Sequence, residues 1–207
     1  MMLNREKMDP SLFNENLRQG GEDIEFLVRN GLLNHQKYIS VPDAIVTHPW
    51  WDSGRMQSGR NFRYGQGSAQ IASLPTIKPY TYRDLLNPAE SILFLLLFSP
   101  LVLWLFSGTL LLLLFGTILF TEFVTIYLKA IIRGRTYSLK VAWCLLMLKN
   151  TNEAGYLWKA LTDGRVSGIA ERIDVSFRKP HPSWFRLNKW KIVKILLTLV
   201  CLYFIFR

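Results

Sequence analysis

Few residues in this sequence have the types and spacing that catalysis or metal binding requires. The three histidines, His35, His48 and His181, are far apart and show no metal-ligand spacing. There is no phosphate-binding loop, no nucleophilic serine elbow and no recognisable pair of catalytic carboxylates. Cys144 and Cys201 lie in apolar stretches and are expected to be packing residues, with palmitoylation as the alternative for Cys144. We therefore expect a protein that is not an enzyme and that needs no cofactor or metal.

Glu122 is the charged residue that stands out, because it interrupts a long apolar stretch. Ionisable groups inside membrane helices are usually functional. Hydroxyl residues recur beside it at intervals of four, and small and hydroxyl residues let helices approach and hydrogen-bond to one another. We therefore expect this face of the helix to associate with other helices. Two alternatives are that the Glu122 side chain extends to the cytoplasmic surface, or that it takes part in proton or ion transport. The face comprises Gly116, Thr117, Thr121, Glu122 and Thr125.

The apolar stretch is long enough for two membrane helices and too long for one. A membrane-spanning helix needs about 20 apolar residues, and a soluble core helix that is apolar on every face is improbable in 207 residues. A break at Ser107-Gly108 gives helices over residues 88–106 and 109–129, whereas a break at Pro100 leaves the first helix too short. We predict a transmembrane hairpin with its tip at Ser107-Gly108 and a tolerated kink at Pro100.

The net charge of +10 is concentrated in one part of the chain. Residues 129–194 hold fourteen basic and four acidic side chains, whereas residues 1–90 hold ten of each. Lys and Arg near membrane spans stay on the cytoplasmic side. We therefore expect the N-terminus and residues 129–194 to be cytoplasmic and the hairpin tip to lie on the far side. The competing reading, nucleic-acid binding, is disfavoured because the basic residues are scattered and no recognition motif accompanies them.

Residues 190–207 are predicted to form a third, C-terminal transmembrane helix, with a membrane-surface helix as the alternative. Residues 195–206 are apolar on every face, which argues against a surface helix. A true span would place the C-terminus on the far side of the membrane. Long basic side chains and an interfacial tryptophan would reach the cytoplasmic surface at the start of this helix: Lys189, Trp190, Lys191 and Lys194.

Residues 136–149 contain an apolar run that is too short to cross a membrane. We expect this segment to lie along the cytoplasmic interface or, alternatively, to be buried under the protein's own loops. Several tryptophans are candidate anchors for the membrane interface or a partner protein: Trp50, Trp51, Trp143 and Trp190. Basic residues are candidate contacts for anionic lipid phosphates: Arg133, Arg135, Lys140, Lys189, Lys191 and Lys194.

The soluble parts are predicted to be short helices and loops. We expect two short helices in the N-terminal segment, separated by Gly20-Gly21 and used for docking. A helix over residues 152–161 and a short strand within residues 172–177 are expected later in the chain. The domain organisation is an N-terminal cytoplasmic helical segment, a loop region rich in Gly, Arg and Trp, the hairpin, a basic cytoplasmic segment and the C-terminal helix: residues 1–40, 41–87, 88–129, 130–189 and 190–207.

The central part of the chain resembles a known family in its layout. "YRDLLNPAESILFLLLFSPLVLWLF" followed by "IIRGRTYSLKVAWCLLMLKN" is similar to the small hairpin-type inner-membrane subunits of bacterial type IV secretion and conjugation systems (IcmT/TraK-type). In those proteins an aromatic-Arg-Asp element precedes the hairpin and an Arg/Gly-Thr element opens the following helix. The corresponding residues here are Tyr82-Arg83-Asp84 and Gly134-Arg135-Thr136, and the resemblance covers about residues 82–150.

The resemblance implies a structural role in the bacterial inner membrane, where such subunits help to couple a cytoplasmic ATPase to the envelope complex. We therefore expect a mostly α, multi-pass membrane protein that acts as a non-enzymatic scaffold subunit. Its expected partners are membrane lipids, other subunits of the complex and further copies of itself, without direct nucleic-acid contact. The alternative is a small oligomeric transport or membrane-active protein that uses Glu122. A nucleic-acid-contacting membrane anchor is a third possibility.

Overall fold

The structure, a computed structural model, describes residues 13–17, 19–32, 35, 55–175, 177, 180 and 186–207. Within them the chain is mostly helical, as predicted. The helices are α1 (Glu22–Leu32), α2 (Ser58–Ala72), α3 (Pro88–Leu105), α4 (Gly108–Gly134), α5 (Leu139–Thr162) and α6 (Lys189–Phe206). The shorter elements are the 3₁₀ helices η3 (Lys78–Tyr80) and η4 (Val166–Gly168) and the strands β1 (Thr81–Arg83) and β2 (Glu171–Ile173).

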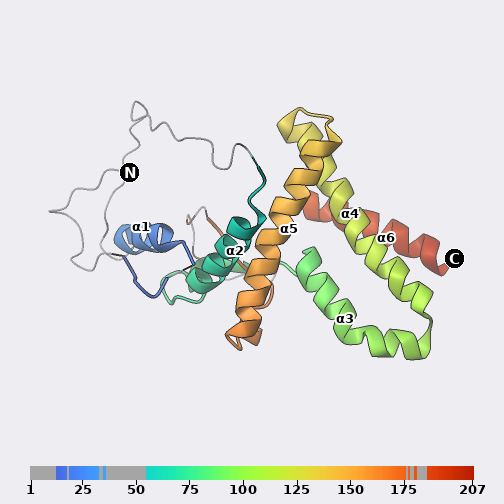
Figure 1. Cartoon of the computed structure of the whole chain (residues 1–207), viewed down its shortest axis with the longest axis horizontal. Coiled ribbons are helices and arrows are strands. Elements are labelled where there is room, and N and C mark those ends of the chain that lie inside the picture. The colour runs from blue at the N-terminus through green and yellow to red at the C-terminus, as the bar shows by residue number, and fades with distance from the viewer. Residues whose placement is uncertain are drawn as a thin grey trace.

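The apolar stretch forms two helices with a sharp break between them, as predicted. α3 ends at Leu105 and α4 begins at Gly108, so the break falls at the predicted tip. The side-chain oxygen of Ser107 accepts a hydrogen bond from the backbone N–H of Leu110 at 3.2 Å and caps α4. Pro100 lies inside α3, and Figure 1 shows that α3 bends about halfway along its length.

α4 is longer than the sequence analysis predicted. It continues past Lys129 and ends at Gly134, and Arg135 follows in the left-handed conformation with φ of 48°. A non-glycine residue adopts this conformation rarely, and here it ends the helix. The chain then turns back, so that α5 runs down beside the upper part of α4 (Figure 1).

α3 and α4 are long and apolar enough to cross a membrane, and the chain itself covers little of them. Only 11% of the apolar window of α3 and 22% of that of α4 are buried. Leu97 is 64% exposed and Trp104 is 80% exposed. A core helix of a soluble protein would have this surface buried, because burial of apolar area drives folding. Within the described part of the chain the two helices are therefore not core helices, and most of their apolar surface is exposed.

The predicted third span is not confirmed. α6 has 18 residues, and three lysines lie in its first two turns. The apolar part that follows Lys194 has only 12 residues, which is about 18 Å of helix against a hydrocarbon core of about 30 Å. α6 packs against α4 over part of its length, and its far end lies at the C-terminus of the chain (Figure 1).

α5 is one continuous helix where the sequence analysis expected two. The expected segments 136–149 and 152–161 join without a break, since residues 150 and 151 contain no helix-breaking glycine or proline. The helix ends at Thr162, close to the predicted end, and Gly164 follows with φ of 66°. One end of α5 packs on α4 and the other on α2, so α5 connects the apolar hairpin to the remaining helices (Figure 1).

The prediction of a loop over residues 41–87 is wrong for residues 58–72, which form α2. Three glycines give this segment a low intrinsic helix propensity, and packing against α5 stabilises it. A Cβ atom added to Gly65 would lie 1.9 Å from the backbone oxygen of Asn152, and one added to Gly155 would lie 2.0 Å from that of Phe62. The two helices therefore touch through their backbones at paired glycines.

The two strands form a small antiparallel pair in which Tyr82 lies opposite Arg172. β2 falls within the segment that the sequence analysis expected to be a strand. The pair joins the chain just before α3 to the chain beyond α5. Beside it lies a small apolar core shared with α1 and α2, formed by Leu17, Val28, Ile71 and Ile77, with Ile173 of β2 packed against it.

The N-terminal segment matches the expectation in part. α1 corresponds to the second predicted helix and begins directly after Gly21. Residues 13–17, from the first predicted helix, form a turn instead. A segment this short cannot repay the entropy of helix nucleation without extensive packing.

Replacement of Gly155 by Ala should destabilise the α2–α5 contact. We expect the free energy of unfolding to fall by about 1–3 kcal/mol, because the new methyl group overlaps backbone atoms that cannot move aside easily. Chemical unfolding in mild detergent, followed by tryptophan fluorescence, measures this change. Gly59→Ala is the matched control: its Cβ would have no neighbour within 4 Å, so the effect should be neutral or a gain of up to about 1 kcal/mol. Equal effects in the two variants would contradict the close approach.

Candidate functional site

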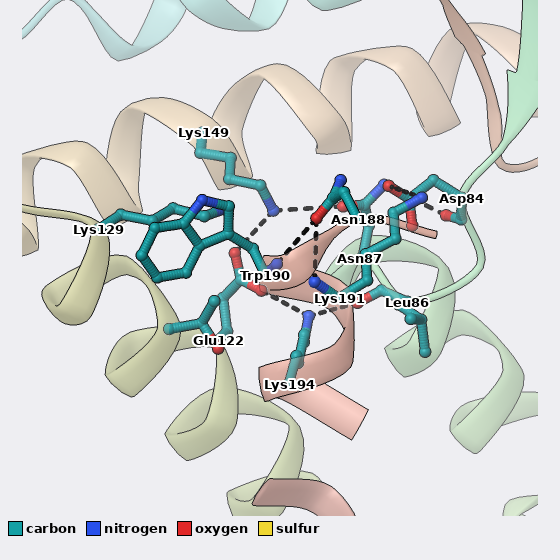
Figure 2. A pocket seen from close by; sticks show the side chains of 11 residues that line it. Asp84, Leu86, Asn87, Glu122, Lys129, Lys149, Asn188, Trp190, Lys191 and Lys194 are labelled. Carbon is teal, nitrogen blue, oxygen red and sulfur yellow. Dashed lines mark hydrogen bonds and ion pairs between the residues drawn. The ribbon is translucent and has the colours of Figure 1, made fainter. Parts of the chain in front are cut away.

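Glu122 lies at the centre of a buried polar cluster. Its side chain is almost fully buried, at 3% exposure. Lys149 of α5 contacts one carboxylate oxygen at 2.6 Å, and Lys194 of α6 contacts the other at 2.5 Å. Figure 2 shows the two lysine side chains approaching the carboxylate from different helices. No partner for this carboxylate was predicted from the sequence, whereas the fold supplies two lysines.

The start of α3 completes the bonding of the two lysines. Lys194 donates a hydrogen bond to the backbone carbonyl of Leu86, and Lys149 donates one to the side-chain oxygen of Asn87 at 3.2 Å. A buried ion pair is tolerated only where such additional hydrogen bonds satisfy the remaining donors. The cluster therefore links four helices through one carboxylate.

A second ion pair lies beside the first. The ammonium group of Lys191 is 3.0 Å from a carboxylate oxygen of Asp84, which follows β1. Lys191 and Lys194 were expected to extend outward to the cytoplasmic surface, and the structure corrects this direction. Both side chains are buried, because α6 packs on α4 with this face and two carboxylates are available inside.

Trp190 is buried rather than exposed as an interfacial anchor. Three cations lie over its ring: Lys129 at 5.6 Å from the ring centroid, Arg133 at 5.8 Å and Lys189 at 5.5 Å. Cations are attracted to an aromatic face. Trp190 therefore packs beneath the basic end of α4, next to Glu122 (Figure 2).

The threonine stripe on α4 is buried, in keeping with a packing face. The hydroxyls of Thr117, Thr121 and Thr125 donate to the backbone oxygen four residues earlier at 2.8, 2.8 and 2.7 Å. These donors are satisfied within α4, and among the described residues they make none of the expected hydrogen bonds across helices. Gly116 lies off this face, and a Cβ atom there would meet nothing within 4 Å. It therefore permits no close helix approach within this chain.

A second charged cluster, which the sequence analysis missed, lies at the start of α3. Arg172 of β2 contacts Glu90 at 2.7 Å, also pairs with Glu153 of α5, and lies 4.5 Å above the ring of Tyr156. Glu90 is fully buried. Burial alone lowers the pKa of the Arg172 guanidinium, but the two carboxylates outweigh it and hold the pKa above its ordinary value. The guanidinium therefore stays charged.

The two clusters are neighbours. Lys149 lies 4.0 Å from Glu153 and so stands between Glu122 and Arg172. The sequence indicated the two acids of this arrangement, since Glu90 and Glu122 bracket the charge-free stretch. Nothing in the sequence indicated which basic residues would pair with them.

A cavity of about 70 Å³ opens beside Glu122. Figure 2 shows the side chains around it. They come from the segment before α3 and from α4, α5 and α6: Asp84, Leu86, Asn87, Glu122, Thr125, Lys129, Lys149, Asn188, Trp190, Lys191 and Lys194.

The remaining predicted contact residues lie on the surface or outside the described residues. Trp143 is 55% exposed. The basic side chains around the α4–α5 turn and at the start of α6 are also exposed: Arg133, Arg135, Lys140 and Lys189. Trp50 and Trp51 lie outside the described residues. Cys144 and Cys201 are half-buried free thiols and take no part in the cluster.

The described residues contain no group of three His, Cys, Asp or Glu side chains that could hold a metal ion. Comparison of the chain with protein-family models, curated proteins and solved structures finds no match. What the fold itself defines is a mostly helical protein with two helices apolar enough to span a membrane. A buried ion-pair cluster lies where the start of α3 and the middle of α4 meet α5 and α6.

Replacement of Glu122 by Gln should strongly destabilise the protein. The change leaves Lys149 and Lys194 buried without their counter-charge, and loss of one partner of a buried ion pair costs about 3–5 kcal/mol. Chemical unfolding in mild detergent measures the loss. Asp163→Asn is the control, because it removes the partly exposed Lys159–Asp163 pair and should cost less than about 1 kcal/mol. A loss below 1 kcal/mol for Glu122→Gln would mean that the cluster is not formed as described.

Proposed function

We propose that this protein is a non-enzymatic scaffold subunit of the bacterial inner membrane, which joins a membrane hairpin rigidly to a cytoplasmic module. The observation that carries the proposal is the single helix α5. It packs on α4 and α3 at one part of its length and on α2 at another, without a flexible joint between them. A continuous helix that packs tightly at both contacts holds the two parts of the protein in a fixed relative position. An enzyme would instead need a reaction site, and a carrier would need a route for its substrate through the membrane.

The membrane placement rests on the exposed apolar surface of α3 and α4. α4 is about 40 Å long at 1.5 Å per residue, which exceeds a hydrocarbon core of about 30 Å. α3 is about 27 Å long, and its 18 residues lie at the short end of the range of about 17–25 residues found in membrane spans. The rest of the chain buries only 11% of the apolar window of α3 and 22% of that of α4. Lipid is the simplest cover for two antiparallel helices of this composition.

The orientation follows from charge. The basic surplus of residues 129–194 lies on the opposite side from the uncharged hairpin tip, so this surplus and the N-terminal region face the cytoplasm. A C-terminal span by α6 belongs to the same proposal. In that case the C-terminus would lie on the far side.

The partners we propose are other subunits of a multiprotein envelope complex, including a cytoplasmic ATPase. The resemblance of residues 82–150 to hairpin subunits of type IV secretion and conjugation systems supports this class of complex. The docking module would be the small core of α2 and the strands together with residues 1–40, which include α1. Exposed apolar side chains on α1 and α2, such as Ile24 and Tyr64, offer contact surface.

The alternative, a transport protein that uses Glu122, is less favoured. Both carboxylate oxygens already contact lysines of the same chain. A transported proton or cation would have to displace two ammonium groups from this carboxylate.

Site-directed labelling tests the membrane placement and orientation. With Cys144 and Cys201 changed to Ser, Ser138→Cys in the α4–α5 turn should react with a membrane-impermeant maleimide only from the cytoplasmic side. Ser107→Cys at the hairpin tip should react only from the far side. Labelling of both positions from one side would contradict a spanning hairpin.

Co-purification tests the scaffold role. The full chain and a variant lacking residues 1–40 are isolated from native membranes in mild detergent, and the retained proteins are identified by mass spectrometry. We expect the truncated chain to remain in the membrane fraction, because α3 and α4 are intact, and to lose a soluble partner. Recovery of an identical set of proteins, or of the chain alone, would count against docking through this segment.

A further inference from the structure

The cavity beside Glu122 carries more positive than negative charge. Its walls hold four lysines and two carboxylates, so the formal charge of its ionised groups is +2, four minus two. The lysines come from three helices: Lys129 from α4, Lys149 from α5, and Lys191 and Lys194 from α6. Helix packing therefore concentrates positive charge at this point.

Lys129 is the lysine whose charge is not balanced by a carboxylate. The other three contact Glu122 or Asp84, as described above. Among the described residues Lys129 forms no ion pair, and its ammonium lies 5.6 Å from the centroid of the Trp190 ring. An aromatic face attracts a cation only modestly. An anion in the cavity would complete the charge balance around Lys129.

A neutral donor lies in the same wall. The indole Nε1 of Trp190 is buried and has no hydrogen-bond partner among the described residues. An indole N–H and an ammonium group can only donate hydrogen bonds. The groups around the cavity therefore suit a ligand with several acceptor oxygens and a negative charge. A phosphate group has both, and charge-assisted hydrogen bonds to it are strong.

The size of the cavity agrees with such a group. A single water molecule needs roughly 10–15 Å³ of cavity, whereas this cavity has about 70 Å³. Eight of its eleven lining side chains carry a charge or an amide group, and they come from the chain before α3, from α4 and α5 and from the start of α6.

The position of Lys129 along α4 places one end of the cavity at the level of lipid headgroups, whereas Glu122, about 21 Å from Gly108, lies deeper. From Gly108 at the hairpin tip to Lys129, α4 extends about 31 Å at 1.5 Å per residue. A hydrocarbon core is about 30 Å thick. If the tip lies at one surface, Lys129 and the first residues of α3 and α6 therefore lie at the other.

We propose that the lysine pocket, formed by Lys129, Lys149, Lys191 and Lys194, binds the phosphate group of an anionic phospholipid headgroup. Basic pockets between membrane helices on the cytoplasmic side hold anionic headgroups in other proteins. The site depends on the hairpin lying in a membrane and not on the scaffold role, so either can fail without the other. The bound phosphate would hold α4 and α6 together at the surface of the bilayer.

The test compares two lysine variants of the full chain in mild detergent by native mass spectrometry with added phosphatidylglycerol. We expect the wild type to retain one lipid per chain and Lys129→Met to bind it about tenfold more weakly. Lys140→Met, which removes the same charge from an exposed position outside the pocket, should change the affinity less than about twofold. Unchanged binding by Lys129→Met, or equal losses in both variants, would overturn the site.

Two further measurements test the lysine pocket without relying on a variant that folds and distinguish a lipid headgroup from a free anion. In the wild type, phosphatidylglycerol should protect Lys129 but not Lys140 from an amine-labelling reagent, and this readout needs no variant to fold. Excess inorganic phosphate distinguishes the source of the ligand. Little protection by phosphate supports a lipid headgroup, whereas protection by inorganic phosphate equal to that by lipid would overturn the lipid assignment in favour of a free anion site.

Discussion

The rest of the structure depends on the burial of one carboxylate, that of Glu122, in a helix that carries no charge in the roughly four turns before it. A lone carboxylate in this position would be strongly unfavourable, because burial removes its hydration. Lys149 and Lys194, which come from two other helices, neutralise the charge of this carboxylate. Their bonds to Leu86 and Asn87 then fix the start of α3. Four helices therefore take their relative positions from one charge.

This constraint extends from the hairpin into the rest of the molecule. Lys149 lies near Glu153, which pairs with Arg172, and Arg172 in turn reaches Glu90 at the start of α3. A few residues further along α5, Gly155 lets α2 pack against the helix backbone. The polar clusters and the glycine contact follow one another along α5. A displacement of the hairpin would therefore also displace α2 and the small core beside it. This mechanical coupling is the physical basis of the proposed scaffold role.

The parts of the fold that depend on local sequence were predictable. The charge-free stretch and the Ser107-Gly108 break identified both apolar helices and the tip. α2 was missed because its glycines weaken the helical signal, and only packing on α5 makes it helical. α5 was divided in two because the apolar run within residues 136–149 was considered separately from the helix over residues 152–161, whereas polar residues at their junction, Lys149 and Glu153, form the polar clusters.

The candidate site was predictable only at its centre. Glu122 and the threonine stripe stood out from the sequence, but the partners of Glu122 lie 27 and 72 residues away along the chain. No spacing rule connects such distant residues. Lys191 and Lys194 were expected to point outward, because snorkelling is usual for lysines at a helix end. Carboxylates on other elements turn them inward, and only tertiary structure shows this.

A double-mutant cycle between Glu122 and Lys194 tests the central claim most directly. The free energies of unfolding of the wild type, Glu122→Gln, Lys194→Met and the double variant would be measured in the same detergent. If the ion pair joins α4 to α6, the two changes should be coupled by about 1–3 kcal/mol, with the double variant less destabilised than the sum of the single variants. Additive effects, within about 0.5 kcal/mol, would mean that the two side chains do not interact and would contradict the account.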